Sequence, residues 1–207
     1  MREADTALLV IDVQTDFLPG GRLAVPDGDA VVPLINRLAR RFANVILTQD
    51  WHPAGHRSFA STHPGRQPFE TIRLPYGAQV LWPDHCVQGT EGAALAPALD
   101  IQHAVLVLRK GYRAPVDSYS AFNEADGTPT GLAGYLRERG IGRVVLAGLA
   151  TDFCVGFSAI DARHAGFAAV VIDDACRGID ANGSLARAWA AMTHAGVERL
   201  DSAALNN

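Results

Sequence analysis

Almost at once the chain enters a compact aliphatic run, Ala7-Leu8-Leu9-Val10-Ile11-Asp12-Val13. A short and nearly continuous apolar segment of this kind predicts a strand buried on both faces. Helical periodicity follows over residues 29–42, and a second apolar strand is expected over residues 45–48. The N-terminal part of the chain therefore predicts a strand–helix–strand unit.

The same alternation resumes after a long interruption. Residues 58–98 are rich in Pro and Gly with little periodicity, which predicts an excursion that holds only short elements. Further strands are expected over residues 104–108, 144–149, 168–172 and 197–200, and helices near residues 131–139, 152–165 and 181–195. We predict one α/β domain over residues 1–207: a doubly wound, mostly parallel sheet flanked by helices on both faces.

Composition narrows the class of protein. The chain has 207 residues, of which 48% are hydrophobic and 19% charged, enough for one well-packed domain. Its formal net charge of −4, without a run of Lys or Arg, does not favour nucleic acid as a partner. No apolar stretch approaches the length of a membrane span and the N-terminus lacks the pattern of a signal peptide, so we expect no membrane partner and a cytoplasmic location.

The three cysteines, Cys86, Cys154 and Cys176, cannot all pair with one another. A reducing compartment would keep them free. We therefore expect at least one thiol to have a chemical role.

Reactive side chains follow four of the predicted strands. In a doubly wound sheet the ligand crevice lies beyond the carboxyl ends of the strands, so these side chains are expected to converge. They are Asp12 after the first strand, Asp50 and His52 after the second, Arg109 and Lys110 after the third, and Asp152 and Cys154 after the fourth.

Cys154 is the candidate nucleophile, because it follows a strand in the first turn of a predicted helix that Asp152 can cap. Its backbone N–H, with another from the turn, can form an oxyanion hole. Asp12 can serve as a base for the thiol, and Lys110 as a cation that stabilises the thiolate. Taken singly, each of the three residues also has another interpretation. For Cys154 it is a small buried apolar residue, and for Lys110 a solvated surface charge. For Asp12 it is a cap, a metal ligand or a contact to a nucleotide ribose. The ribose contact is disfavoured because no glycine-rich phosphate loop follows Asp12.

A second group of residues has the composition of a metal site. The stretches Asp50-Trp51-His52-Pro53-Ala54-Gly55-His56 and Trp82-Pro83-Asp84-His85 bring a carboxylate and two or three imidazoles to predicted loops. These are ligands for a borderline divalent metal, and three of them would leave coordination positions open.

The chain resembles the nicotinamidase/pyrazinamidase group of the isochorismatase-like cysteine hydrolases over nearly its whole length. The resemblance is carried by several independent motifs in order. They are Leu9-Val10-Ile11-Asp12-Val13-Gln14-Thr15-Asp16-Phe17, Thr48-Gln49-Asp50-Trp51-His52-Pro53 with His56 and Ser58-Phe59, Trp82-Pro83-Asp84-His85-Cys86-Val87-Gln88-Gly89-Thr90, Lys110-Gly111-Tyr112, Asp117-Ser118-Tyr119-Ser120-Ala121-Phe122, and Gly148-Leu149-Ala150-Thr151-Asp152-Phe153-Cys154-Val155.

The resemblance implies a catalytic triad of Asp12, Lys110 and Cys154. It also implies a cis peptide bond between Leu149 and Ala150, with the backbone amides of Ala150 and Cys154 forming the oxyanion hole. The positions that match the family's substrate pocket are Phe17, Leu23, Trp82 and Tyr119.

The resemblance further implies that Asp50, His52 and His85 bind one divalent ion, zinc or iron, with manganese as an alternative. His56 can be a fourth ligand by its spacing from His52. We favour a role for His56 behind the ligands or in the pocket, with an ordinary surface histidine as the other interpretation.

The implied reaction converts nicotinamide to nicotinate and ammonia, and pyrazinamide to pyrazinoate, through a cysteine thioester. The metal ion would dock the ring nitrogen of a small aromatic carboxamide. The reaction would serve NAD salvage. Assembly into a homo-oligomer is possible, and the sequence does not decide it. One alternative is another isochorismatase-like cysteine hydrolase, acting on a different amide or on isochorismate, which would not need the metal ligands. A non-enzymatic metal or redox-sensing module is the other, and it would not explain Asp12 and Lys110.

Overall fold

The computed structural model describes residues 5–206, so residues 1–4 and 207 of the expected domain lie outside the described part. Its centre is a six-stranded sheet in the order β5-β2-β1-β6-β7-β8, in which every neighbouring pair is parallel. The strands are β1 (Thr6–Ile11), β2 (Asn44–Asp50), β5 (Leu106–Lys110), β6 (Arg143–Leu149), β7 (Ala168–Arg177) and β8 (Glu198–Leu200). The helices are α1 (Val32–Ala39), α2 (Leu132–Glu138), α3 (Gly156–His164) and α4 (Ser184–His194).

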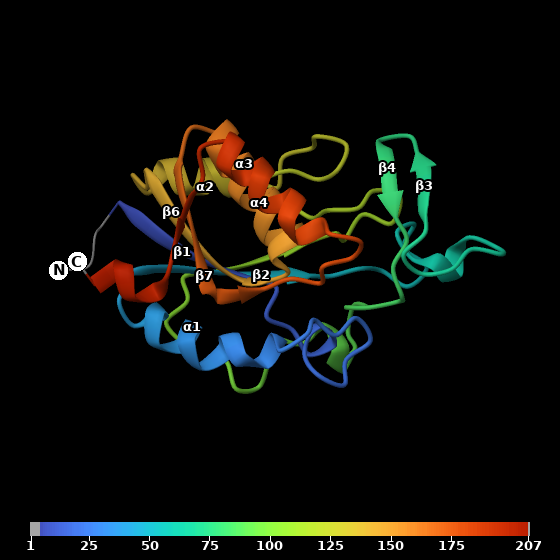
Figure 1. Cartoon of the computed structure of the whole chain (residues 1–207), viewed down its shortest axis with the longest axis horizontal. Coiled ribbons are helices and arrows are strands. Elements are labelled where there is room, and N and C mark those ends of the chain that lie inside the picture. The colour runs from blue at the N-terminus through green and yellow to red at the C-terminus, as the bar shows by residue number, and fades with distance from the viewer. Residues whose placement is uncertain (1–4, 207) are drawn as a thin grey trace.

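The sheet is doubly wound, as predicted. From β1 the chain proceeds through β2 to β5 at one edge, then crosses back to β6 and continues through β7 to β8 at the other edge. Helix α1 covers one face of the sheet, and α2, α3 and α4 cover the other (Figure 1). The winding reverses between the neighbouring strands β1 and β6, and in open parallel sheets ligands bind at such a reversal, beyond the strand ends.

Strand β1 shows why the apolar run at the start of the chain forms the centre of the fold. Leu8 and Val10 pack into the cluster on the α1 face, whereas Leu9 and Ile11 pack into the cluster beneath α2, α3 and α4. All four are at most 1% exposed, and complete burial of such a side chain stabilises a fold by about 1.5–3 kcal/mol.

The predicted elements are all present, but their ends are shifted where polar residues continue a strand. Strand β5 runs to Lys110 rather than ending at residue 108. Strand β7 continues past residue 172 through Asp173 and Asp174 to Arg177. An apolar run stops at the first charged residue, whereas the backbone pairing of the strand does not. The helix expected over residues 29–42 is shorter, with a 3₁₀ turn at Gly28–Val31 before α1.

The long excursion projects beyond the carboxyl ends of the strands (Figure 1). It contains 3₁₀ turns at Ala60–Thr62 and Glu91–Ala93 and an antiparallel hairpin of β3 (Thr71–Leu74) and β4 (Gly77–Val80). Single bridges between His52 and Val87 and between Phe59 and Trp82 hold its two ends together. Within residues 5–206, no helix has the length and apolar character needed to span a bilayer.

Candidate active site

Three predicted residues from different strand ends meet in one buried cluster. Lys110 Nζ, at the end of β5, lies 2.9 Å from Asp12 Oδ2 and 3.4 Å from Cys154 Sγ. The same ammonium group donates hydrogen bonds to Asp50 Oδ1 at 2.5 Å and to the Ser118 carbonyl at 2.8 Å. Lys110 is 0% exposed, so the interpretation of this residue as a solvated surface lysine is wrong.

Asp12 is positioned to accept a proton. Its backbone is in the left-handed region with φ 47°, which turns the chain at the end of β1. The Thr48 hydroxyl donates to Asp12 Oδ1 at 2.6 Å and accepts from the Asp12 N–H at 3.1 Å. The other oxygen, Oδ2, forms the ion pair with Lys110 but has no hydrogen-bond partner among residues 5–206. A carboxylate oxygen of Asp12 also lies within 4.8 Å of Cys154 Sγ, so Asp12 can take the thiol proton.

The electrostatics of the cluster keep the resting thiol protonated. Burial, with the charges of Asp12 and Asp50, raises the pKa of Cys154 well above its ordinary value despite the opposing effect of Lys110. Burial alone would lower the pKa of Lys110, but the two carboxylates raise it well above its ordinary value. Lys110 favours the thiolate, as expected, but burial and the two carboxylates outweigh this one ammonium in the resting site. The thiol therefore needs a base.

The turn that carries Cys154 differs from the predicted helix start. Residues Thr151–Val155 form a π-type turn before α3, and Ala150 precedes it without a side-chain cap. The expectation that Asp152 caps the helix is wrong: its carboxylate accepts hydrogen bonds from the N–H groups of Ile179 and Asp180 instead, at 2.9 and 2.8 Å. The peptide bond between Leu149 and Ala150 is cis, as the resemblance implies.

A second buried group comprises Asp50, His52 and His85, whose ligand atoms lie within 4.8 Å of one another. Asp50 Oδ2 is 3.6 Å from His52 Nε2 and 3.9 Å from His85 Nε2. Burial and the nearby His52 lower the pKa of His85 to about 4, so this imidazole is neutral at pH 7.

Backbone carbonyls orient both imidazoles toward that common point. His52 Nδ1 is 2.9 Å from the Gly111 carbonyl and His85 Nδ1 is 2.8 Å from the Pro83 carbonyl. A proton on each Nδ1 leaves each Nε2 lone pair facing Asp50 Oδ2, which is how histidine ligands are usually held. At Gly111, with φ 65°, a Cβ atom would lie 2.5 Å from His52 Cε1, so the close approach requires glycine. The donor set therefore fits one divalent cation.

His56 lies behind the ligands. It is 0% exposed, so the interpretation as a surface histidine is wrong, and its ring centroid is 4.4 Å from that of His52. Its Nδ1 pairs with Ser58 Oγ at 2.8 Å, and its Nε2 is 3.1 Å from the carbonyls of both Arg113 and Val116. Both ring nitrogens are thus engaged, which favours a supporting role over ligation.

A small pocket is lined by the thiol, by the three metal-type ligands and by all four residues expected from the resemblance. Its lining comprises Phe17, Leu23, Asp50, His52, Trp82, His85, Asp117, Tyr119, Ala150, Phe153, Cys154 and Ile179. Such apolar and aromatic walls with a few converging polar groups suit a small flat ring.

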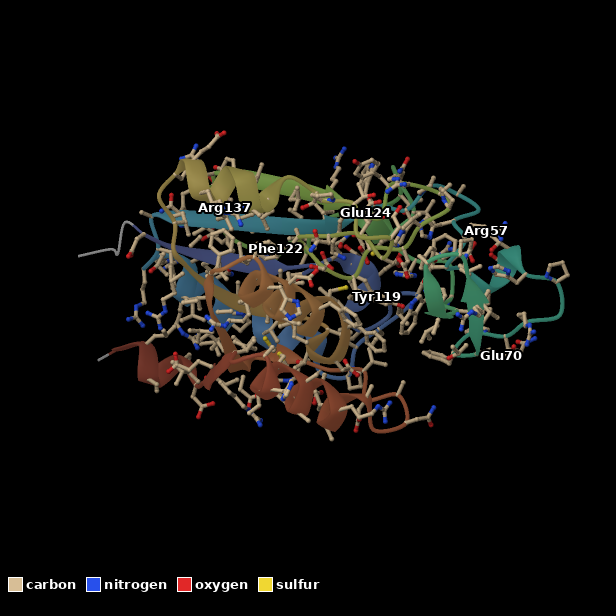
Figure 2. The ribbon with its side chains drawn as sticks, turned by 90° about the horizontal axis from the view of Figure 1, so that it is seen from above. Arg57, Glu70, Tyr119, Phe122, Glu124 and Arg137 are labelled. Atoms are coloured by element: carbon tan, nitrogen blue, oxygen red, sulfur yellow. The ribbon has the colours of Figure 1, made fainter. Side chains whose placement is uncertain are left out.

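The aromatic wall is braced from the excursion. The Tyr119 hydroxyl accepts hydrogen bonds from Trp82 Nε1 at 2.9 Å and Gln79 Nε2 at 3.2 Å, and Gln79 also donates to Asp117 Oδ2 at 2.7 Å. Figure 2 shows Tyr119 between the central sheet and the β3–β4 hairpin that carries Gln79.

Four neighbours of the site were not predicted. Thr48 lies within a strand that we assigned only by its apolar character, and Asp117 and Ile179 lie in segments whose folding back onto the pocket has no local signal. Phe153 packs against Trp82 with ring centroids 4.8 Å apart. Its position next to the candidate nucleophile was one signal, and Thr48, Asp117 and Phe153 also stand in the motifs that carry the resemblance.

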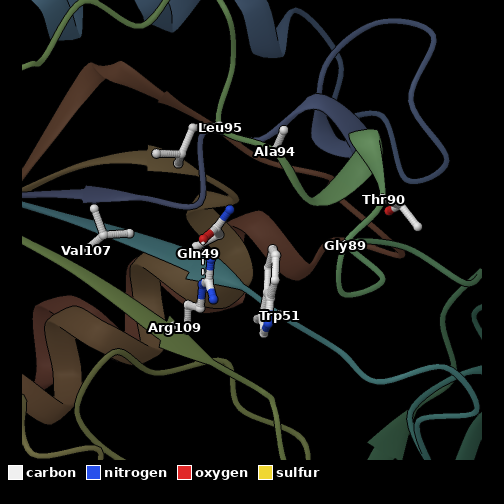
Figure 3. A pocket seen from close by; sticks show the side chains of 8 residues that line it. All are labelled: Gln49, Trp51, Gly89, Thr90, Ala94, Leu95, Val107 and Arg109. Carbon is white, nitrogen blue, oxygen red and sulfur yellow. Dashed lines mark hydrogen bonds between the residues drawn. The ribbon is translucent and has the colours of Figure 1, made fainter.

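A second, more open groove lies at the β2–β5 edge and is lined by Arg109, so this side chain does not converge with the others as expected. Gln49 and Trp51 flank Asp50 along the chain, and Arg109 precedes Lys110. In Figure 3 the Arg109 guanidinium stacks on Trp51, at 3.8 Å from the ring centroid, and donates to Gln49. Side chains alternate along a strand, so this groove lies on the face away from the cluster.

Comparison with known proteins gives consistent similarities. The model of the isochorismatase domain family matches residues 6–204. A nicotinamidase of Acinetobacter baylyi is 58% identical over 204 residues, which cover 98% of this chain and 95% of the relative.

Solved structures agree over similar lengths. The nicotinamidase/pyrazinamidase of Acinetobacter baumanii matches with a TM-score of 0.98 and 58% identity, over 99% of this chain and all of that one. A protein from L. infantum in complex with nicotinate matches with a TM-score of 0.86 and 40% identity, over 99% and 96% of the two chains. The pyrazinamidase of Pyrococcus horikoshii in complex with zinc matches with a TM-score of 0.78 and 35% identity, over 95% and 99%. With its fold, its buried cluster and these similarities, the chain belongs to the isochorismatase family.

Proposed function

We propose that the protein is a hydrolase that converts nicotinamide to nicotinate and ammonia, and pyrazinamide to pyrazinoate. The observation that carries the proposal is that one aromatic pocket is lined both by Cys154, which has Asp12 beside it, and by the three converging metal-type ligands Asp50, His52 and His85. The names of the relatives, and the nicotinate in the L. infantum structure, support the substrate class.

The reaction begins with the thiol. Asp12 takes the proton from Cys154, and the sulfur attacks the carboxamide carbon to give a tetrahedral oxyanion. We assign the backbone amides of Ala150 and Cys154 to that oxyanion. Asp12 then returns the proton to the leaving nitrogen, and ammonia departs from a thioester on Cys154.

Water completes the cycle. It attacks the thioester carbonyl while Asp12 takes a proton from it, and the tetrahedral intermediate then breaks its C–S bond. The acid is released, and Asp12 returns the proton to the sulfur, which regenerates the free thiol. Division into two acyl transfers replaces one difficult amide hydrolysis by two easier steps. Lys110 keeps its charge throughout, because its pKa lies well above the ordinary value, and so offsets the negative charge that moves between Asp12 and the sulfur.

Asp50, His52 and His85 would hold one divalent metal ion. Carboxylate and imidazole ligands suit zinc or iron, with manganese as an alternative, and the zinc in the P. horikoshii structure supports zinc. When bound, the ion would supply a coordination position for the ring nitrogen of the substrate, which orients the carboxamide toward Cys154. We propose that the reaction serves NAD salvage; the cytoplasmic location and the homo-oligomer stay predictions.

The test is ammonia release by the purified protein from nicotinamide and from benzamide, which lacks the ring nitrogen. We expect release from nicotinamide, a much higher KM for benzamide, and no release by Cys154→Ala. Cys176→Ala is the matched control, because Cys176 is also buried but does not line the pocket. Absence of release from nicotinamide by the wild-type protein would overturn the proposal.

A further inference from the structure

Asp16 is a buried carboxylate that the proposed reaction does not use. It follows β1 in the short 3₁₀ turn Thr15–Phe17 and is 5% exposed. A buried carboxylate is costly unless its oxygens are hydrogen-bonded, so its partners indicate why it is there.

One carboxylate oxygen of Asp16 holds the segment that carries a proposed metal ligand. Asp16 Oδ2 accepts a hydrogen bond from the backbone N–H of Cys86 at 2.7 Å, across 70 residues of sequence. Cys86 directly follows His85 and is in the left-handed region, with φ 45°. A residue other than glycine adopts that conformation only where its surroundings hold it there.

The backbone of Cys86 also contacts the other histidine. Its carbonyl accepts a hydrogen bond from the His52 N–H at 3.0 Å, and the Gln88 N–H donates to the His52 carbonyl at 2.8 Å. One residue thus follows His85 in the chain and pairs with His52 in space. Cys86 therefore links the chain at His85 to the backbone of His52.

The second oxygen of Asp16 holds the pocket wall. Asp16 Oδ1 accepts from the Arg22 N–H at 3.2 Å, and the Asp16 backbone carbonyl accepts from the Leu23 N–H at 3.0 Å. Leu23 and Phe17, the neighbour of Asp16 in sequence, both line the pocket. The carboxylate therefore joins the wall of the pocket to the metal-ligand segment.

The Asp16 carboxylate packs directly against Gly92. A Cβ atom at Gly92 would lie 2.1 Å from Asp16 Oδ2, so the carboxylate fills the space that the glycine leaves. The backbone of Gly92 is not in the left-handed region, so an alanine there conflicts with Asp16 and not with its own backbone conformation.

We propose that Asp16 is a positioning residue, which holds His85 and His52 at the separation that a divalent cation requires and couples this separation to the pocket wall. The proposal rests on the metal site of the proposed function. It predicts that loss of the carboxylate weakens metal binding and raises KM, while the reactivity of the thiol is unchanged when zinc-free proteins are compared.

The experiment measures the zinc dissociation constant of the full-length protein by competition with a chromophoric chelator. We expect Asp16→Ala to weaken zinc binding by about 10- to 100-fold, as loss of groups that support metal ligands typically does. Gly92→Ala should weaken it similarly although Asp16 is intact, and it serves as the second variant if Asp16→Ala fails to fold. Asp16→Asn keeps one acceptor oxygen and should lose less.

The matched control is Asn36→Ala. The Asn36 side chain likewise joins two segments, through the Asp100 N–H and the Ala98 carbonyl, but none of its partners is a predicted site residue. Its removal should leave the zinc affinity unchanged.

In the zinc-free proteins, the rate of Cys154 alkylation should be the same for Asp16→Ala and wild type.

The outcomes separate the two proposals. If Asp16→Ala and Gly92→Ala bind zinc as tightly as wild type and Asn36→Ala, the positioning role is overturned. A wild-type protein that binds zinc but releases no ammonia from nicotinamide would overturn the proposed function alone. A wild-type protein that binds no zinc would overturn the metal site and the role of Asp16 with it.

Discussion

Lys110 Nζ lies 2.9 Å from Asp12 Oδ2, and both side chains are 0% exposed. The same ammonium reaches Asp50 at 2.5 Å, so one lysine joins the proposed base to a proposed metal ligand. A buried charge of this kind is tolerated only with partners, and removal of one member leaves the others uncompensated.

The first prediction concerns that lysine. Lys110→Met should destabilise the fold by about 3–5 kcal/mol in urea unfolding, because two buried carboxylates lose their cation. Ammonia release should be lost with it. Arg109→Met is the neighbouring control: its guanidinium is on the exposed face of the same strand, so its loss should cost roughly 1 kcal/mol or less. Equal unfolding midpoints for Lys110→Met and wild type would contradict the description of the cluster.

A second prediction follows from the hydrogen bond that the Thr48 hydroxyl donates to Asp12. Burial raises the pKa of Asp12, and the Thr48 hydrogen bond opposes the rise because it stabilises the charged form. The reaction needs the carboxylate, so kcat/KM should fall as the pH drops through this pKa. Thr48→Val should move that acid limb to higher pH, whereas Thr48→Ser keeps the hydroxyl and should leave it in place. A pH profile of kcat/KM measures both, and an acid limb that is unmoved in Thr48→Val would argue against Asp12 as the base.

Metal removal should change the thiol as well as substrate binding. Without the ion, burial and two carboxylates outweigh one ammonium and raise the pKa of the Cys154 thiol. A divalent cation at Asp50 reverses this balance. Alkylation of Cys154 by iodoacetamide should therefore reach its half-maximal rate at higher pH after chelation, and zinc should restore the original value. An identical pH dependence in both forms would place the metal too far from the thiol to act on it.

The close approach of β1 and β6 gives a prediction for stability. At Gly148, with φ 129°, a Cβ atom would lie 2.1 Å from the Ile11 carbonyl oxygen, so Gly148→Ala should destabilise the fold by about 3 kcal/mol or more. Gly134→Ala in α2 is the control, because nothing lies within 4 Å and alanine favours the helix by roughly 0.5–1 kcal/mol. Thermal unfolding of the two variants should move in opposite directions. A Gly148→Ala variant as stable as wild type would show that the strands can separate.

The sequence predicts the centre of this fold better than its edges. Strands such as β1 are continuous apolar runs because both faces are buried, so their positions can be recognised directly. Strands β5 and β7 end in charged residues, and hydrophobic pattern alone stops short of them. The convergence of Asp12, Lys110 and Cys154 was predictable because parallel strands end at one edge of the sheet.

The supporting residues could not be predicted in the same way. Asp152 has the sequence position of a helix cap, yet it binds the N–H groups of Ile179 and Asp180 because that loop folds back onto it. Asp16 contacts Cys86 across 70 residues. Such contacts depend on the folded path of loops, for which local sequence carries little signal.

The most direct test of the account is intact-protein mass spectrometry of the enzyme quenched in acid during turnover of nicotinamide. The account predicts a population whose mass has increased by one nicotinoyl group, located on the peptide that contains Cys154 and absent from Cys154→Ala. Steady release of ammonia by Cys154→Ala, or an acyl group found on another residue, would contradict it.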